Sequence, residues 1–362
     1  MPKLKKRTDG RYTITATING KRKYFYGRTR IEAQEKCDAY EKQSDNIANF
    51  NADITIAEWA PEWLHIKEPT VSPVTMDSYK HIIDNHILPL IGNVKLCELT
   101  VIMVRRLLDI KLEKNLSSRT VRYIYTVLNA MVKQAVNDEL IGKNVVSKVQ
   151  KPKLVKTHEM VTLSADEVKK FLSIIKNEEH HAFFKLAFAS GLRRSELLGL
   201  AWSNVDFKKQ TITVEQTVIR VGNDIILSKS TKNASSKRSV KLDTETMAEL
   251  KKHSITVKKR MLSTYEWINN DLVFPGEKGN PTYPTYASEL CKKYAAAIGK
   301  PAFSMHGTRH THATLLIEAG VNFKVIQTRL GHASFNETMD TYSHLTPILE
   351  YDAVDKLEKI LS

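Results

Sequence analysis

Residues 303–344, FSMHGTRHTHATLLIEAGVNFKVIQTRLGHASFNETMDTYSH, combine a helical apolar pattern with many chemically reactive side chains. The apolar residues recur every three to four positions, which predicts buried helices. They are Ala313, Leu315, Leu316, Ala319, Val325, Ile326 and Leu330. Gly320 and Gly331 interrupt the pattern where such helices would end. The reactive set is His306, Arg309, His310, His312, Arg329, His332, Tyr342 and His344. Cationic, imidazole and phenol groups on a packed helical frame indicate a reaction centre.

The composition limits the class of protein. A chain of 362 residues predicts two or three domains, and 42% hydrophobic residues support real cores. No apolar run approaches the eighteen or so residues of a membrane span, so no membrane partner is expected. Cys37, Cys97 and Cys291 are far apart and odd in number, which fits neither a disulfide framework nor a paired-cysteine metal site. A reducing, cytoplasmic location is the simplest interpretation.

The charge favours a polyanionic partner. Lys and Arg number 55 against 40 Asp and Glu, a net charge of +15. Neutralising phosphates releases condensed counterions, so such an excess suits nucleic acid, although a merely soluble basic protein explains the total equally well. The distribution favours nucleic acid, because residues 1–30 hold ten Lys or Arg and one acid.

The N-terminal segment predicts a small DNA-binding module. Residues 11–18 alternate as a strand, Asn19-Gly20 is a strong hairpin signal, and KRKYFYG at 21–27 returns as a second strand before a helix that ends near residue 42. A two-stranded ribbon fits the major groove of DNA. The candidate contacts are Lys21, Arg22, Lys23, Tyr24 and Tyr26. A solvated basic hairpin is the alternative.

After a polar linker at 43–53, residues 54–147 predict an all-α domain. Thr75 is expected to cap one of its helices, which Pro89 and Gly92 would end, and another helix follows Leu116. The first turn of that helix carries candidate phosphate contacts, although a plain cap also explains their hydroxyls. They are Ser117, Ser118, Arg119, Thr120 and Arg122. A basic linker follows at 148–158, whose Lys151 and Lys153 are further DNA-binding candidates.

The remaining chain predicts a third, mainly helical domain with a small antiparallel sheet. Ser164 and Glu167 form a capping box, and residues 183–189 form a buried helix. Strands are expected at 211–218, 223–228 and 238–242. The fold class is therefore multidomain α+β.

Two further stretches carry unusual polar groups. In GLRRSELLGL, residues 191–200, Arg193 and Glu196 share one helical face, so the acid can orient the guanidinium. In STKNASSKRSVKL, residues 230–242, Lys232 lies in a turn between two predicted strands. Taken alone, an ordinary surface ion pair would explain the first stretch, and a solvated turn would explain the second.

Together, these motifs and HGTRHTHATLLIEAG, LGHASF and TMDTYSH resemble the signatures of the tyrosine recombinase (phage integrase) family, in the same order. The layout resembles the integrases of temperate phages and of conjugative transposons of Gram-positive bacteria. The resemblance implies an arm-type DNA-binding domain at 1–45, a helical core-binding domain at 54–147 and a catalytic domain at 159–362.

The resemblance also implies a role for each matching residue. Arg193 and Arg309 would hold the scissile phosphate, with Glu196 supporting Arg193. Lys232 would protonate the leaving 5′ oxygen, although Lys229 and Lys237 compete for this assignment. His306 would assist proton transfer, His332 would hydrogen-bond the phosphate, and Tyr342 would attack phosphorus. No cofactor or metal is expected, because guanidinium groups stabilise the charge and transesterification conserves the bond energy.

The implied function is site-specific recombination that integrates a mobile element, with excision as a further outcome. The implied partners are double-stranded DNA with core-type and arm-type sites, a homotetramer formed through the tail at 353–362, a DNA-bending host factor and an excision factor. A type IB topoisomerase-like enzyme and an inactive DNA-binding regulator are the alternatives. A zinc site built from the histidines is disfavoured, because Arg309 lies among them and no HExxH motif or cysteine pair is present.

Overall fold

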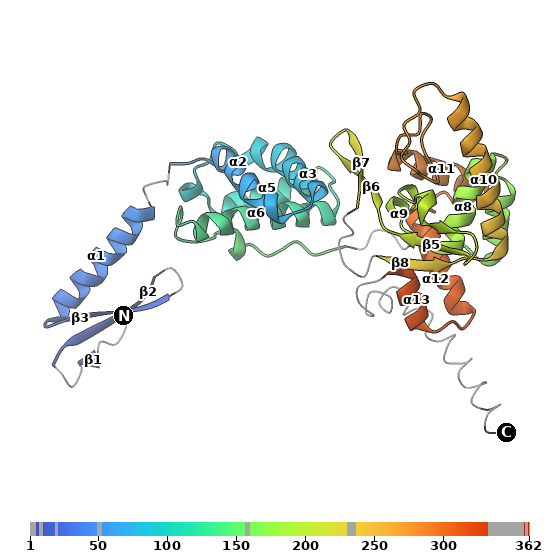
Figure 1. Ribbon diagram of the computed structural model, residues 1–362. Helices are drawn as coiled ribbons and strands as arrows, with labels where there is room; N and C mark the ends of the chain where they lie inside the picture. The colour runs from blue at the N-terminus through green and yellow to red at the C-terminus, as the bar shows by residue number, and fades with distance from the viewer. Residues whose placement is uncertain are drawn as a thin grey trace. The chain divides into compact units, whose positions relative to one another are not determined.

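The structure is a computed structural model that describes residues 5–6, 10–18, 21–48, 53–155, 160–229, 237–331, 358 and 361. Its contacts divide the chain into two units, Met1–Thr157 and His158–Ser362 (Figure 1). Helices dominate and the strands form small antiparallel sheets, so the predicted α+β class is confirmed. Among the described residues, no helix is both long enough and apolar enough to cross a lipid bilayer.

The N-terminal strands and helix form as predicted. β2 (Tyr12–Ile18) pairs antiparallel with β3 (Lys21–Gly27), and the short β1 (Lys5–Lys6) adds an unpredicted third strand beside β2. α1 (Arg30–Ala48) covers one face of this sheet through a core of Ile14, Ala33 and Cys37. The helix continues beyond residue 42 into the predicted linker, where no Gly or Pro stops it. The Asn19-Gly20 turn lies outside the described residues.

The rest of the first unit is helical, as predicted. Its α-helices are α2 (Ile56–Lys67), α3 (Pro73–Ile82), α4 (Leu88–Ile91), α5 (Val101–Glu113) and α6 (Ser118–Asn137). Its shorter turns are the 3₁₀ helices η1 (Glu68–Thr70), η3 (Leu96–Glu98) and η4 (Val146–Lys148) and the π-helix η2 (Ile83–Ile87). The apolar face of α6 is the centre of the core, because Val121, Ile124, Leu128 and Met131 are buried on it at helical spacing.

Two predictions about these helix ends are wrong. Ser72, not Thr75, caps α3: its Oγ accepts from Thr75 N at 3.3 Å, and Pro73 occupies the first turn, where its missing N–H is harmless. Pro89 was predicted to end this same helix with Gly92, but the helical turns continue through it in α4 (Leu88–Ile91), and only Gly92 follows the last turn. The helical hydrogen bonds first change to the longer pattern of the π-helix η2. Pro89 has no N–H to donate to the carbonyl of Asn85, and Lys111 Nζ donates to that carbonyl instead, at 3.4 Å.

The second unit contains seven α-helices within the described residues. They are α7 (Ala165–Ser173), α8 (Glu178–Ser190), α9 (Arg194–Leu198), α10 (Thr244–Ser263), α11 (Pro284–Ala297), α12 (Met305–Glu318) and α13 (Phe323–Leu330). The 3₁₀ turn η5 (Trp202–Asn204) precedes the strands. The capping box of Ser164 and Glu167 is confirmed. α8 is central, since α7, α10 and α12 all contact it.

The predicted single sheet of this unit is wrong in detail. The strands are β4 (Val205–Asp206), β5 (Thr211–Val214), β6 (Thr217–Val221), β7 (Asp224–Ser228) and β8 (Arg238–Lys241), in one sheet of order β4-β5-β8 and one β6-β7 hairpin. The predicted strand 211–218 therefore divides in two, because β6 packs against α9, where Gly199 lies against Thr217. β7 and β8, the described strands on either side of residues 230–236, belong to different sheets, so the predicted pairing of these two strands is wrong.

The helices predicted from the opening stretch form as α12 and α13. Gly320 and Gly331 follow them in the left-handed conformation, with φ of 73° and 66°. Two residues expected in the core are exposed, Ala319 at the end of α12 and Val325 on α13. α13 has only eight residues, and its buried face is formed by Ile326 and Leu330, one turn apart.

Candidate active site

Arg193 and Glu196 lie at the start of α9, directly after α8 ends at the left-handed Gly191. The backbone N–H of Arg193 donates to Glu196 Oε2 at 2.9 Å, and its Nη1 donates to Oε1 at 2.9 Å. The Glu196 side chain is only 3% exposed, while that of Arg193 is 35% exposed. The pair is therefore not an ordinary surface ion pair: a buried acid holds a partly exposed guanidinium.

Arg238, which no sequence motif assigned to the site, completes this arrangement. It opens β8 and donates to both Glu196 oxygens, from Nη2 to Oε2 at 2.8 Å and from Nη1 to Oε1 at 3.2 Å. Burial alone would raise the pKa of Glu196, but the hydrogen bonds and charge of Arg238, followed by those of Arg193, lower it below its ordinary value. One signal in the sequence indicated that Arg238 is buried. Residues two apart in a strand lie on the same face, and Arg238 is therefore on the face of the buried Val240.

Arg309 is buried on α12 and connects two other helix ends. Its Nη1 donates to the carbonyl of Gly191 at 2.9 Å, and its Nη2 donates to the carbonyl of Leu330 at 2.8 Å. The side chain therefore reaches from the turn that precedes Arg193 to the end of α13. The structure thus brings Arg193 and Arg309, 116 residues apart in sequence, to the same place.

The C-terminal end of α13 gathers these arginines. Three consecutive carbonyls accept hydrogen bonds there. The carbonyl of Arg329 accepts from Arg238 Nε at 2.8 Å, and the carbonyl of Leu330 accepts from Arg309 Nη2 at 2.8 Å. The carbonyl of Gly331 accepts from Arg193 Nη2 at 3.5 Å. A helix end leaves its last carbonyls unpaired and carries partial negative charge, so guanidinium groups are suitable partners. The next residue in the chain is His332, which lies outside the described residues.

His312 has the structural role that its helical position predicts. Its ring is buried, with Nδ1 2.6 Å from the carbonyl of Phe188 and Nε2 accepting from Arg329 Nε at 3.0 Å. Burial, and then the charge of Arg329, lowers the pKa of His312 to about 4. The neutral ring therefore carries its proton on Nδ1 and joins α12 to α8 and α13.

His306 lies at the first turn of α12, one turn before Arg309, and is exposed. Its ring meets that of His310 edge-on, with centroids 4.6 Å apart. Partial burial of the ring, and then the positive charges of Arg309 and Arg193, lower the pKa of His306 below its ordinary value. A neutral, accessible imidazole beside two guanidinium groups is suited to accept a proton at neutral pH.

Three predicted catalytic residues, Lys232, His332 and Tyr342, lie outside the described residues, and their roles remain predictions. Of the two lysines that compete with Lys232, Lys237 pairs with Glu215 Oε1 at 2.7 Å. Within the described parts of the chain, no three His, Cys, Asp or Glu side chains are grouped as metal ligands.

On the N-terminal sheet, the candidate DNA contacts divide between two faces. Arg22, Tyr24 and Tyr26 alternate on the face away from α1, and all three are exposed. Lys23 is on the other face, where its ammonium hydrogen-bonds the hydroxyl of Tyr40 on α1 and lies 4.2 Å from the ring centre. Nothing of the Lys21 side chain is described.

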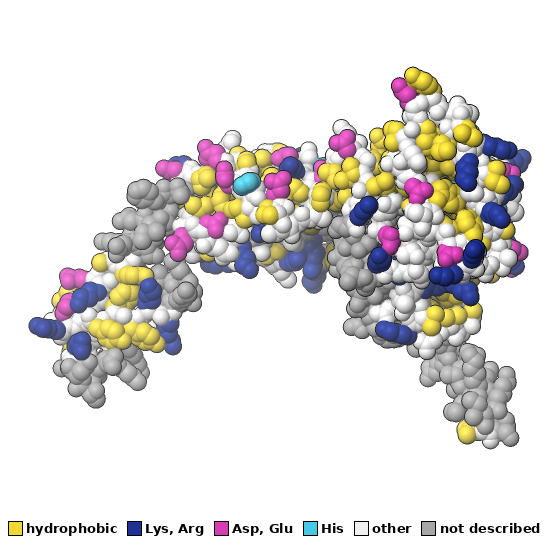
Figure 2. Space-filling model, viewed as in Figure 1, with side chains coloured by type: hydrophobic (Ala, Val, Ile, Leu, Met, Phe, Trp, Pro, Cys, Tyr) yellow, Lys and Arg dark blue, Asp and Glu magenta, His cyan; other side chains and the backbone are white. Residues whose placement is uncertain are grey.

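At the start of α6, two of the five candidate residues bind the linker that follows. Ser118 Oγ accepts from Val155 N at 3.0 Å, and Arg122 Nη1 donates to the carbonyl of Pro152 at 3.1 Å. Ser117 caps the helix by accepting from Thr120 N at 3.1 Å. Arg119, Lys151 and Lys153 are exposed. Figure 2 shows Lys and Arg side chains gathered along the lower edge of the helical part of this unit.

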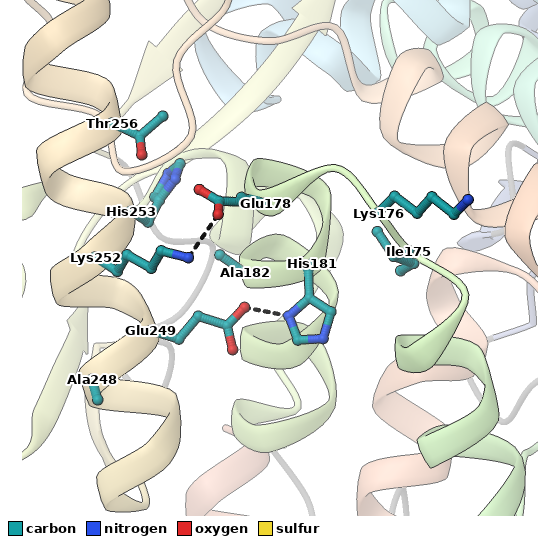
Figure 3. Close-up of a pocket in the computed structure, with 10 residues that line it drawn as sticks. All are labelled: Ile175, Lys176, Glu178, His181, Ala182, Ala248, Glu249, Lys252, His253 and Thr256. Atoms are coloured by element: carbon teal, nitrogen blue, oxygen red, sulfur yellow. Dashed lines mark hydrogen bonds and ion pairs between the residues drawn. The ribbon is translucent and has the colours of Figure 1, made fainter.

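A cavity of about 470 Å³ between α8 and α10 is distinct from this site (Figure 3). Glu178 pairs across it with Lys252 at 2.6 Å, and His181 pairs with Glu249. The residues that α8 contributes, Glu178, His181 and Ala182, lie in its first turns, whereas Arg193 follows its last turn, and a 13-residue helix is about 20 Å long. These side-chain pairs join two helices and are remote from the arginines.

Comparison with known proteins agrees with this geometry. A model of the phage integrase family matches residues 161–347, and one of the phage integrase N-terminal SAM-like domain matches residues 55–112. The chain is 29% identical to a tyrosine recombinase XerC-like protein of Caldanaerobacter subterraneus, over 96% of each chain, and 25% identical to the ICEBs1 integrase of Bacillus subtilis, over 99% of this chain and 100% of that protein.

Among solved structures, the Tn1549 transposon integrase in complex with transposon right end DNA shares the fold. Its TM-score is 0.68 at 21% identity, over 85% of this chain and 100% of that one. The family model spans the segments that carry both arginines of the site, over more than half of the 362 residues. This chain therefore belongs to the phage integrase family.

Proposed function

We propose that this chain is a site-specific DNA recombinase that integrates a mobile element, and also excises it, through a 3′-phosphotyrosyl intermediate. The observation that carries the proposal is the convergence of Arg193 and Arg309 at the end of α13, one residue before His332. Family membership supports the same reaction class.

The two guanidinium groups suit a phosphodiester. Its transition state concentrates negative charge on the non-bridging oxygens, and fixed cationic donors stabilise that state more than the ground state. Arg193 is held by a buried carboxylate and Arg309 by two backbone carbonyls, so neither needs to be ordered during the reaction. This preorganisation replaces a metal ion as the source of charge stabilisation.

The cleavage step then needs a nucleophile and two proton transfers. Tyr342 Oη attacks phosphorus, the bond from phosphorus to the 5′ oxygen breaks, and a 3′-phosphotyrosyl bond forms. The phenol, with an ordinary pKa of about 10, gives its proton to His306, whose lowered pKa keeps it neutral. Lys232 protonates the leaving 5′ oxygen, and His332 hydrogen-bonds the phosphate. Attack by a 5′ hydroxyl of another strand reverses these steps.

The domain division assigns the DNA contacts. Residues 1–45 bind arm-type sites, 54–147 bind the core, and 159–362 catalyse strand transfer. Tethering two binding modules raises the effective concentration for bridging distant sites. Deleting residues 1–50 is expected to leave cleavage of core sites intact and to impair integration. Equal integration by the truncated protein would contradict this division.

The assembly on DNA is a homotetramer joined through the tail at 353–362, with a DNA-bending host factor and an excision factor as further partners. In a helix, the spacing of Val354, Leu357, Ile360 and Leu361 would set these four apolar residues on one side of that tail. Leu361 is among the described residues and is 78% exposed. Neither alternative, a topoisomerase-like enzyme or an inactive regulator, is favoured by a specific observation.

Covalent capture tests the proposal on a pool of DNA sequences, so the attachment site need not be chosen in advance. The protein is incubated with random-sequence duplexes nicked to trap the covalent intermediate, and DNA that remains protein-linked in detergent is amplified and sequenced. Wild type should enrich one sequence, Tyr342→Phe should capture none, and the exposed-tyrosine control Tyr283→Phe should match wild type. Strand exchange between two selected duplexes then excludes a topoisomerase, and absence of any covalent product with wild type would refute the proposal.

A further inference from the structure

We propose that Arg238 is a positioning residue for strand cleavage, which acts by holding Glu196 and, through it, Arg193. The inference rests on the proposed function, because it concerns the orientation of a group assigned there to the scissile phosphate. Arg238 has no assigned contact with DNA. Its action is indirect, through one shared carboxylate.

The shared carboxylate is shielded from water on the side of Arg238. The side chains of Arg238 and Glu196 are 5% and 3% exposed, whereas Arg193 is 35% exposed. Two parallel N–H···O bonds from a planar guanidinium fix both the position and the rotation of a carboxylate. Glu196 can therefore present Oε1 to Arg193 Nη1 in one orientation only, while the other side of Arg193 remains accessible.

A third contact links this arrangement to the end of α13. Arg238 Nε donates to the carbonyl of Arg329, two residues before Gly331, whose carbonyl accepts from Arg193. A Cβ on Gly331 would lie 3.0 Å from Cδ and Nη1 of Arg238, so the guanidinium and this backbone are in close contact. β8 and α13 lie side by side in Figure 1. One side chain thus connects the strand, Glu196 and the helix end.

Loss of Arg238 would leave Glu196 with Arg193 as its remaining guanidinium partner. The carboxylate could then rotate toward Arg193 and draw it inward, away from the phosphate. Lysine preserves the charge but offers a compact ammonium without the planar fork, so it cannot fix both oxygens in the same way. We therefore expect the cleavage rate to fall much more than DNA affinity.

The test measures single-turnover formation of the covalent complex on the selected duplex. For Arg238→Lys and Arg238→Gln, the rate should fall by about 100-fold, the usual effect of misplacing a catalytic group by an ångström. The dissociation constant for the uncleaved duplex should change less than about 3-fold. The matched control is Arg260→Lys, since Arg260 also binds both oxygens of a glutamate, Glu179, and a backbone carbonyl, that of Pro275. It should cleave at the wild-type rate.

Two readouts separate positioning from a general loss of folding. On a duplex whose scissile phosphate is an uncharged methylphosphonate, a guanidinium has less charge to neutralise, so the deficit of the Arg238 variants should shrink several-fold. A folding defect would be equal on both substrates. In addition, Arg238→Lys combined with Glu196→Gln should cleave no more slowly than the slower single variant.

The outcomes are distinguishable from failure of the proposed function. If wild type forms no covalent complex, the proposed function fails. If wild type does so and Arg238→Lys cleaves within about 3-fold of it, Arg238 does not position Arg193. A deficit that is the same on phosphate and methylphosphonate, or that multiplies with that of Glu196→Gln, also overturns the inference.

Discussion

The imidazole of His312 accepts a hydrogen bond from Arg329 at Nε2, 3.0 Å away, while its Nδ1 lies 2.6 Å from the carbonyl of Phe188. Arg329 also donates from Nη2 to the carbonyl of Ala189 at 2.8 Å. A neutral histidine therefore fixes an arginine of α13 against the end of α8. That contact places the carbonyls of residues 329–331 where Arg238, Arg309 and Arg193 meet them.

This contact makes stability sensitive to acid. The pKa of His312 is lowered from 6.5 to about 4, so between these values the unfolded chain binds a proton that the folded chain does not. Stability from this group is therefore complete above pH 6.5 and falls as the pH drops toward 4, by about 3 kcal/mol for this single site. Buried His253 and partly buried His180 also have lowered pKa values and act in the same direction.

Denaturant unfolding between pH 4.5 and 7.5 checks this expectation. His312→Gln removes one titrating group, so the free energy of unfolding should lose less between pH 7 and pH 4.5 than in wild type. Parallel curves for the two proteins would show that folding does not lower the pKa of His312.

Gly191 should be intolerant of a side chain for two separate reasons. Its φ of 66° is left-handed, and a Cβ there would lie 2.5 Å from Cδ2 of His312 and 3.0 Å from Cδ2 of Leu330. We expect Gly191→Ala to lower the free energy of unfolding by about 3 kcal/mol, the sum of backbone strain and overpacking. Gly222→Ala is the control, since Gly222 has a φ of 58° with nothing within 4 Å of its Cβ, and should cost only about 1 kcal/mol. Equal losses would show that the core around Gly191 adapts freely.

Local spacing in the sequence predicted the Arg193–Glu196 pair and several helix ends, because these features depend on neighbours in the chain. The Arg193–Glu196 spacing within one helical turn, the left-handed glycines and the capping box are all of this kind. Arg238 was missed because its partner Glu196 is 42 residues away and belongs to a helix, so no local spacing connects them. A charged residue at a buried strand position was the remaining clue.

The errors in the fold have the same cause. Pro89 signals a helix end locally, and only the distant Lys111 supplies the donor that compensates for it. The strand at 211–218 reads as continuous, but contact with α9 divides it. At α6, the contact of Ser118 and Arg122 with residues 152–155 depends on how the chain returns, which no local pattern encodes, while their contact with phosphate stays a prediction.

Arg119 and Arg122 therefore make a matched pair on α6. Arg119 is exposed, so Arg119→Ala should weaken DNA binding and reduce the slope of log affinity against log salt by about 1, with unchanged stability. Arg122→Ala removes the bond to Pro152, so faster amide hydrogen exchange is expected at Val155, whose N–H binds the adjacent Ser118. Reversal of these two phenotypes would show that Arg122, not Arg119, contacts the backbone of DNA.

The neighbouring residues Arg22 and Lys23 of β3 allow a similar comparison. Replacing either one with Ala removes one positive charge, so the two variants differ only in the face of the sheet that is changed. Arg22 is on the exposed face with Tyr24 and Tyr26, so Arg22→Ala should weaken binding of the full-length protein to arm-site DNA by up to about 10-fold at low salt. Lys23→Ala removes the hydrogen bond and cation–π contact to Tyr40, which should lower the stability of the N-terminal module by about 1 kcal/mol. Arm-site affinity measured with increasing salt, together with hydrogen exchange of β2 and β3, separates the two effects. If both variants lose the same affinity without any change in exchange, the DNA-binding surface is not confined to the face that carries Arg22.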